Sequence, residues 1–355
     1  MATLTGSGHP SYTTAGDTIP SSAVLLDQPA EHRPRPTRMM TSRALLLTLA
    51  FSAAAACGQT AARYEGLCDA SAAVALDALH FVVASDEDNL LRIFDRDKPK
   101  ALATLSLEAF LRTRRIEADL EGAARIGERI YWIGSLSRDS KGRPAPQRNL
   151  LFATDIERGT TPPTLRPVGR GPVPLLDALV ASAAGQAWRL ADAAHKSPET
   201  PGGLNVEGLT SADDGALLIG LRSPLREGKA LVLPLRNPAQ AIDGQPPEFG
   251  DAIALDLDGR GVRAMTRLAD GYVVVGGPTA DAGSFALFRW RGGSAPAQRF
   301  PQPALGSLRP EALIVWAGIP QLQLLSDDGA VKIGGNPCKK LPAHARSFRG
   351  LLFAP

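Results

Sequence analysis

Short apolar runs alternate with polar turns over residues 64–355. The runs are four to six residues long and favour Val, Ile, Phe, Tyr and Trp, as at 81–84, 130–133, 217–220, 272–275 and 322–325. Several are bounded by turn residues, including Asp-Gly pairs at 214–215 and 270–271. Runs of this length and composition, with such turns, are typical of β-strands joined by tight hairpins. The pattern therefore predicts an all-β domain.

A short unit resembling Glu-Gly-apolar recurs ahead of these runs. Its five copies place the following residues at one repeat position: Glu65, Glu121, Glu207, Arg260 and Glu311. These positions are 51 to 56 residues apart, except for one interval of 86. A repeat of roughly 40 to 50 residues that carries about four strands is typical of a propeller blade. We therefore expect a β-propeller of five or six blades over residues 64–355.

The long interval contains residues 175–195, where apolar residues recur near helical spacing and Ala is abundant. This segment predicts one helix inserted between strands. The final apolar segment, 348–353, predicts a strand that pairs with the N-terminal strands and closes the ring, which would remove an exposed sheet edge.

Several segments together resemble a known family: 206–209 (VEGL), 220–225 (GLRSPL), 257–262 (LDGRGV), 277–279 (GPT) and 289–291 (RWR). Their order and spacing are similar to the bacterial family called domain of unknown function 3616, over most of residues 60–355. This resemblance implies a propeller-like fold and no established activity. The Glu-Gly-Leu units also resemble, more distantly, those of phytase-like esterase propellers.

The N-terminal region suggests export. Residues 1–38 are rich in Thr, Ser, Pro and Gly and have no apolar period, which predicts a disordered leader. Residues 39–57 combine Arg43, an apolar stretch and small residues before Cys57, the pattern of a secretory signal. Translation would then start at Met39 or Met40, unless the long leader is genuine. We expect a bacterial periplasmic or cell-envelope protein.

The three cysteines fit an oxidising compartment. Cys57 directly follows the alanines at 53–56, so lipidation of Cys57 competes with ordinary cleavage after an Ala-x-Ala site. Cys68 and Cys338 would remain as a pair, either bridged or as two buried thiols. A net charge of +3 on 355 residues gives no sign of a nucleic-acid surface. We expect a monomer that contacts membrane only through a lipid anchor or its signal segment.

Repeated residues on the innermost strands of a propeller converge around its axis. The carboxylates of Glu65, Glu121, Glu207 and Glu311 would then meet near one mouth, with Arg260 among them. Such a group could bind Ca²⁺, which prefers six to eight oxygen ligands, or each Glu could pair with a nearby arginine and join neighbouring blades. Arg222 and Arg309 are further candidates for binding a ligand. Asp86 to Asn89 lacks the spacing of a calcium loop and predicts a solvated hairpin tip.

No nucleophile elbow, His-Glu-x-x-His motif or phosphate-binding loop occurs in the sequence. Two functions remain open. One is a propeller that binds a small molecule or a protein partner in the cell envelope. The other is a calcium-dependent phosphoesterase or esterase in which one carboxylate activates water.

Overall fold

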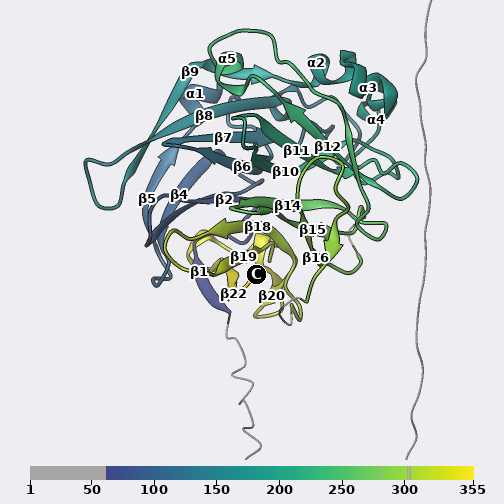
Figure 1. Ribbon diagram of the computed structural model, residues 1–355. Coiled ribbons are helices and arrows are strands. Elements are labelled where there is room, and N and C mark those ends of the chain that lie inside the picture. Colours follow the sequence, from purple (N-terminus) through teal and green to yellow (C-terminus); the bar gives the residue numbers. More distant parts are fainter. Residues whose placement is uncertain (1–60, 281, 302, 304) are drawn as a thin grey trace, which may run out of the picture. The chain divides into compact units, whose positions relative to one another are not determined.

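The computed structural model describes residues 61–280, 282–301, 303 and 305–355 (Figure 1). The predicted leader, the signal segment and the lipidation site at Cys57 lie outside the described residues. Within them, five four-stranded antiparallel sheets form the blades of a β-propeller. The sequence left the count at five or six blades, and the structure has five.

The first three blades follow chain order from the innermost to the outermost strand. The first blade contains β2 (Ala72–Ala75), β3 (His80–Ala84), β4 (Leu90–Asp95) and β5 (Ala101–Ser106). The second contains β6 (Leu120–Ile126), β7 (Arg129–Gly134), β8 (Leu150–Glu157) and β9 (Thr164–Pro174). The third contains β10 (Asn205–Ser211), β11 (Leu217–Ser223), β12 (Ala230–Leu235) and β13 (Ile253–Leu255).

The fourth blade keeps this order and the fifth closes the ring. The fourth contains β14 (Gly261–Leu268), β15 (Gly271–Gly277), β16 (Ala286–Trp290) and β17 (Gln298–Arg299). The fifth contains β18 (Pro310–Val315), β19 (Leu322–Ser326), β22 (Ser347–Phe353) and, outermost, β1 (Ala62–Glu65). Because β1 pairs antiparallel with β22, the two ends of the domain meet in one sheet, as the sequence predicted.

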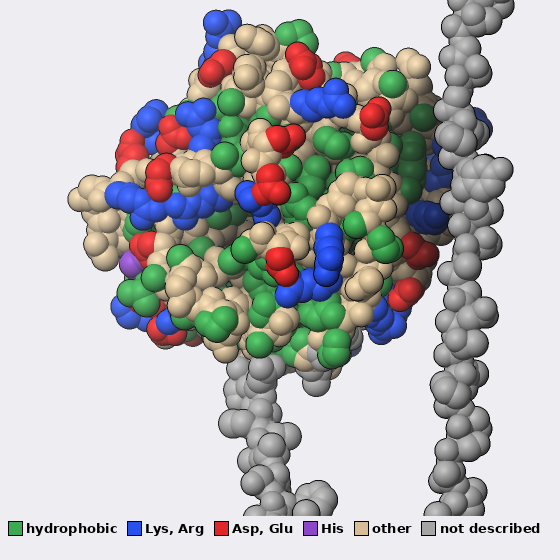
Figure 2. Space-filling model, viewed as in Figure 1, with side chains coloured by type: hydrophobic (Ala, Val, Ile, Leu, Met, Phe, Trp, Pro, Cys, Tyr) green, Lys and Arg blue, Asp and Glu red, His purple; other side chains and the backbone are tan. Residues whose placement is uncertain are grey.

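The apolar core is divided among the blade interfaces. Five clusters of buried residues lie between neighbouring blades, one for each interface. Between the fifth and first blades, Tyr64, Phe81 and Phe348 are in ring contact. Burial of large aromatic side chains at such a contact contributes stability beyond the area removed from water. On the face shown in Figure 2, hydrophobic side chains gather near the middle, with side chains of both charges around them.

The helical insert lies between the second and third blades, as expected, but it is not one helix. It consists of α2 (Leu176–Ala181), α3 (Ala183–Ala187) and α4 (Leu190–Ala194). Ser182 is extended and caps α3, and Arg189 is left-handed, so each interrupts the helical backbone. Two further short helices are α1 (Glu108–Leu111) and α5 (Pro238–Ile242). A short two-stranded sheet, β20 (Lys332–Ile333) and β21 (Asn336–Pro337), precedes β22. Among the described helices, none has the length and apolarity to cross a membrane.

The five innermost strands pack around the axis in the order β2, β6, β10, β14 and β18. Small residues permit this close approach. A Cβ added to Gly122 would lie 2.8 Å from the Cβ of Leu209, and one added to Gly208 would lie 2.6 Å from Cγ1 of Val262. The Gly of the Glu-Gly unit therefore makes room for the inner strand of the next blade.

Candidate functional site

Four of the five inner strands carry a β-bulge at an equivalent place. In each, one residue is left without a partner on the neighbouring strand: Glu121 in β6, Glu207 in β10, Arg263 in β14 and Glu311 in β18. A bulge turns the side chain of the extra residue away from the regular alternation of the strand. The first strand, β2, pairs regularly. The bulges therefore explain how these four charged side chains come to face the axis.

The inner strands surround a central channel, and the charged side chains lie at the end where these strands begin. We call this end the acidic mouth and define it by the following residues: Asp69, Asp86, Asp119, Glu121, Glu207, Glu311 and Asp327. A space of about 10 Å³, lined by residues of all five inner strands, contacts Glu121, Glu207 and Glu311. A space of this size holds about one water molecule or one dehydrated ion. The mouth is therefore narrow and rich in oxygen ligands.

Arginines neutralise one side of the acidic mouth. Arg263, which is 2% exposed, places Nε 2.6 Å from Oε2 of Glu207 and also pairs with Glu311. Arg222 places Nη1 2.8 Å from Oε1 of Glu207. Glu207 thus has two guanidinium partners. Part of the ring is therefore an interblade ion-pair network, the architectural alternative that the sequence left open.

The other side of the mouth has few cations. Asp86, Asp119 and Glu121 each offer a carboxylate oxygen within 4.8 Å of the others. Arg148 pairs with Asp119 at 2.9 Å. Among the described residues, no ion pair reaches Asp86 or Glu121. Three carboxylates so close together repel one another unless protons or a cation are bound.

A second carboxyl pair lies beside the disulfide. The pair consists of Asp69, which is 4% exposed, and Asp327, whose charge acts on Asp69. Cys68, the residue before Asp69, is bridged to Cys338, with a Cα–Cα distance of 5.8 Å. The amide of Asp328 donates to the carbonyl of Cys68, so the disulfide and this hydrogen bond hold the two loops together. A disulfide indicates an oxidising, extracytoplasmic environment.

Burial and neighbouring carboxylates raise the pKa of several of these groups. Burial, with the charges of Asp119 and Asp327, raises the pKa of Asp86 to about 7. Burial raises the pKa of Glu311 to about 8 although Arg263 opposes the shift. Burial and the neighbouring Asp327 raise the pKa of Asp69 to about 10, while the pKa of Asp327 is lowered. The pair therefore shares one proton near neutral pH.

These raised pKa values predict how stability depends on pH. A carboxyl whose pKa is higher in the folded state stabilises the fold below its unfolded pKa, and this contribution is lost as the pH rises through the folded pKa. With a chelator present, we expect the free energy of unfolding to fall between pH 5 and pH 9, through the pKa values of about 7 for Asp86 and about 8 for Glu311. Urea titrations at a series of pH values measure this free energy.

Asp86→Asn should flatten the dependence of the unfolding free energy on pH. Asp270→Asn should not, because the side chain of Asp270 is 77% exposed. A flat wild-type profile would contradict the prediction.

Two of the residues expected in the ring lie elsewhere. Glu65 belongs to β1, the outermost strand of the fifth blade, because the closing strand also carries a Glu-Gly sequence. Arg260 precedes β14, and its Nη2 bonds Oγ of Ser284 at 2.8 Å. The bulge at Arg263 places that residue in the ring instead. Arg222 lies at the mouth, and the charge of Arg309 acts on Asp327.

Arg263 was expected as an arginine partner of the repeat glutamates, and it pairs with Glu207 and Glu311. Several other residues of the mouth were not identified from the repeat: Asp69, Asp119, Arg148 and Asp327. Asp86 was expected to be a solvated hairpin tip, but its side chain is turned to the axis and its amide bonds Oγ of Ser71. The sequence does contain a signal that could have located these acids. In an antiparallel hairpin, the second strand ends beside the start of the first. Acids just before the inner strand or just after the second strand therefore lie at the same mouth.

Residues 189–308 match the family described as Protein of unknown function (DUF3616), which confirms the resemblance over this part of the chain. No curated protein matches the sequence. Among solved structures, glutaminyl cyclase of Myxococcus xanthus is 12% identical, covers 82% of this chain and 94% of its own, and has a TM-score of 0.43.

A GH43_1 enzyme of Xanthomonas citri, in complex with xylose, is 14% identical, with coverage of 84% and 91% and a TM-score of 0.46. A putative glucose dehydrogenase of Thermus thermophilus is 13% identical, with coverage of 83% and 100% and a TM-score of 0.42. Similarities of this size do not identify an activity.

Proposed function

We propose that this protein is an exported ligand-binding propeller of the bacterial cell envelope, whose acidic mouth binds Ca²⁺ together with a small molecule or a partner. The observation that supports this proposal most is the trio Asp86, Asp119 and Glu121, whose oxygens lie within 4.8 Å of one another. They come from two blades: Asp86 follows β3 of the first blade, and Asp119 and Glu121 lie at the start of β6 in the second. Export rests on the signal pattern at 39–57 and agrees with the disulfide; lipidation of Cys57 is part of the same proposal.

The donor set suits a hard cation. Carboxylate oxygens are the ligands that Ca²⁺ prefers, and it takes six to eight of them. Three side chains can supply only part of this number, so water or an oxygen-rich ligand would complete the shell. A bound cation would also displace the protons that Asp86 and Glu121 hold because of their raised pKa values.

Calcium binding is tested by thermal unfolding. Calcium at 100 times its Kd would add about 2.7 kcal/mol, a rise in Tm of about 5 °C for a domain of this size, relative to chelator. Asp86→Asn and Glu121→Gln should each abolish the rise. Asp270→Asn, an exposed acid outside the mouth, is the matched control. The proposal fails if calcium leaves Tm unchanged, or if Asp270→Asn reduces the rise as much as the mouth variants do.

A second candidate function is a calcium-dependent phosphoesterase or esterase. The carboxyl pair Asp69 and Asp327 favours it, because two acids that share one proton can supply a general acid and a general base. Asp86 links the two groups, since its charge acts on both Asp69 and Glu121.

Hydrolysis is tested with nitrophenyl esters of acetate and phosphate. If the protein is an enzyme, chelator removes turnover and Asp327→Asn lowers kcat by about 10²-fold or more without a matching loss of calcium binding. If the wild type turns over neither class of ester but still binds calcium, the binding function stands and the hydrolase is excluded for these substrates.

A further inference from the structure

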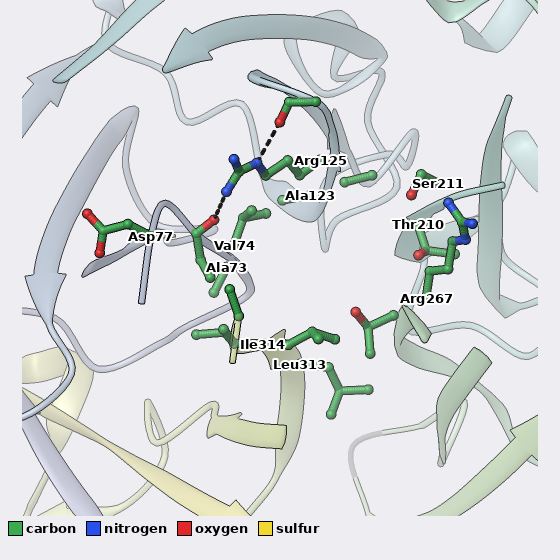
Figure 3. A pocket seen from close by; sticks show the side chains of 16 residues that line it. Ala73, Val74, Asp77, Ala123, Arg125, Thr210, Ser211, Arg267, Leu313 and Ile314 are labelled. Atoms are coloured by element: carbon green, nitrogen blue, oxygen red, sulfur yellow. Dashed lines mark hydrogen bonds between the residues drawn. The ribbon is translucent and has the colours of Figure 1, made fainter. Parts of the chain in front are cut away.

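The largest cavity on the axis lies at the end of the channel opposite to the acidic mouth. It has a volume of about 310 Å³, which is within the size range of small-ligand sites. The last residues of all five inner strands line it (Figure 3). None of the carboxylates of the acidic mouth contacts it, so its chemistry is separate from that of the proposed calcium site.

Hydroxyl groups lie along one half of this cavity. Thr210 and Ser211 come from β10, and Thr266 comes from β14. Thr210 is 4% exposed, and in the described part of the chain no side-chain hydrogen bond satisfies any of these three hydroxyls. Ser211 and Thr266 are partly exposed. These hydroxyls can therefore donate to a ligand in the cavity that accepts hydrogen bonds.

Two guanidinium groups approach the cavity from opposite sides. Arg125 is fixed by the backbone, since Nη1 donates to the carbonyl of Ala75 at 2.8 Å and Nε to that of Gly127 at 2.7 Å (Figure 3). Arg267 lies across from it, next to Thr210 (Figure 3). Its ion pair is with Asp213, whose side chain is 82% exposed. Exposed pairs of this kind contribute little, so Arg267 can exchange Asp213 for another anion.

The remaining half of the cavity is apolar. Leu313 and Val315 from β18, and Ala73 from β2, form this side. Val315 is 38% exposed, one of the few large hydrophobic side chains that the described surface leaves so open. Asp77 is the acid in the lining; its carboxylate lies 2.9 Å from Nδ1 of His80 and accepts hydrogen bonds from two backbone amides. The side of the cavity with Arg267 and the hydroxyls is therefore polar, and the side formed by Leu313, Val315 and Ala73 is apolar.

We propose that this cavity binds a small organic anion. Its carboxylate or phosphate group would accept hydrogen bonds from Arg267 and from the hydroxyls of Thr210 and Thr266, because guanidinium and hydroxyl donors suit both kinds of oxyanion. Its apolar body would lie on Leu313 and Val315. The volume limits the ligand to a compact molecule and excludes a folded protein domain.

The test is calorimetric titration of the full chain with hexanoate, hexyl phosphate, 1-hexanol and hexylammonium. At least one of the two anions should bind at least about tenfold more tightly than the alcohol and the cation, because each loses the charged hydrogen bonds. The comparison between hexanoate and hexyl phosphate identifies which anionic group the site prefers. The inference is overturned if neither anion binds, or if the alcohol or the cation binds equally well.

Variants locate the binding. Arg267→Ala and Thr210→Val should each weaken the preferred anion, the former by about tenfold or more. Asp213→Ala should not weaken binding, since it frees Arg267. Arg289→Ala, which removes an arginine from another exposed ion pair, is the control.

A further variant separates this site from the acidic mouth. Asp86→Asn should leave anion binding unchanged. Equal affinities in Arg267→Ala and Arg289→Ala would refute the assignment, and unchanged circular dichroism excludes misfolding as the cause.

Discussion

Replacing Arg263 by methionine is expected to lower the free energy of unfolding by about 3–5 kcal/mol at pH 7, because it leaves Glu207 and Glu311 buried without their shared partner. Methionine keeps much of the volume of the side chain, so the lost charge dominates the effect. Urea unfolding followed by tryptophan fluorescence measures it. The loss should grow as the pH rises through the pKa of Glu311, which is about 8 with Arg263 beside it, because that carboxyl then becomes charged without its partner.

Two variants make the Arg263 experiment decisive. Arg267→Met removes an exposed ion pair from the same strand and should change stability by less than about 1 kcal/mol. Adding Glu207→Gln and Glu311→Gln to the Arg263→Met protein should recover a large part of the loss, since neither buried side chain then carries a charge that needed Arg263. If Arg263→Met and Arg267→Met lower the free energy of unfolding by the same amount, the stability of the propeller does not depend on the buried ion pairs of the acidic mouth. Should Arg263→Met fail to fold, Arg263→Lys keeps the charge and gives a smaller, measurable loss.

Replacing both Cys68 and Cys338 by serine is the second change with a large expected effect. The bridge joins residues 270 positions apart in sequence, and removing such a bridge typically costs about 2–5 kcal/mol. The loops that carry Asp69 and Asp327 should also loosen. The urea midpoint measures the loss.

Reductant provides the control for the disulfide experiment. Dithiothreitol should lower the midpoint of the wild type to that of the double-serine protein, and should leave the double-serine protein unchanged. A wild type that resists reductant and matches the serine variant would mean that the bridge adds nothing to stability.

The repeat in the sequence was sufficient to predict the blades, the helical insert and the closing strand. Strand length, β-branched residues and turn signals are local properties, and each blade repeats them, so their evidence accumulates along the chain. Glu121, Glu207 and Glu311 were placed correctly near one axis for the same reason.

The remaining residues of the mouth depend on events that a linear pattern does not contain. In β14 the bulge turns Arg263 toward the axis, three residues after the Arg260 that the repeat predicted. No residue pattern in this part of the sequence marks the bulge. Ring closure moves Glu65 from the expected inner strand to the outer one. Asp86 and Asp119 approach each other only when two blades are packed side by side, so the number of residues between them does not reveal the contact. Their positions relative to the inner and second strands place them at the same mouth, but only once the strands of each blade have been assigned.

Closure by β1 and β22 has a consequence for biosynthesis. Residue 353 ends the strand to which β1 must bond, so the seam between the fifth and first blades cannot form until the chain has been synthesised as far as β22. Until then, Phe81 and the other aromatic side chains of that seam remain open to water. If the protein is exported, as we propose, its chain crosses the membrane with these apolar residues still unpaired. We then expect folding to be aided by a chaperone that binds unfolded chains on the far side.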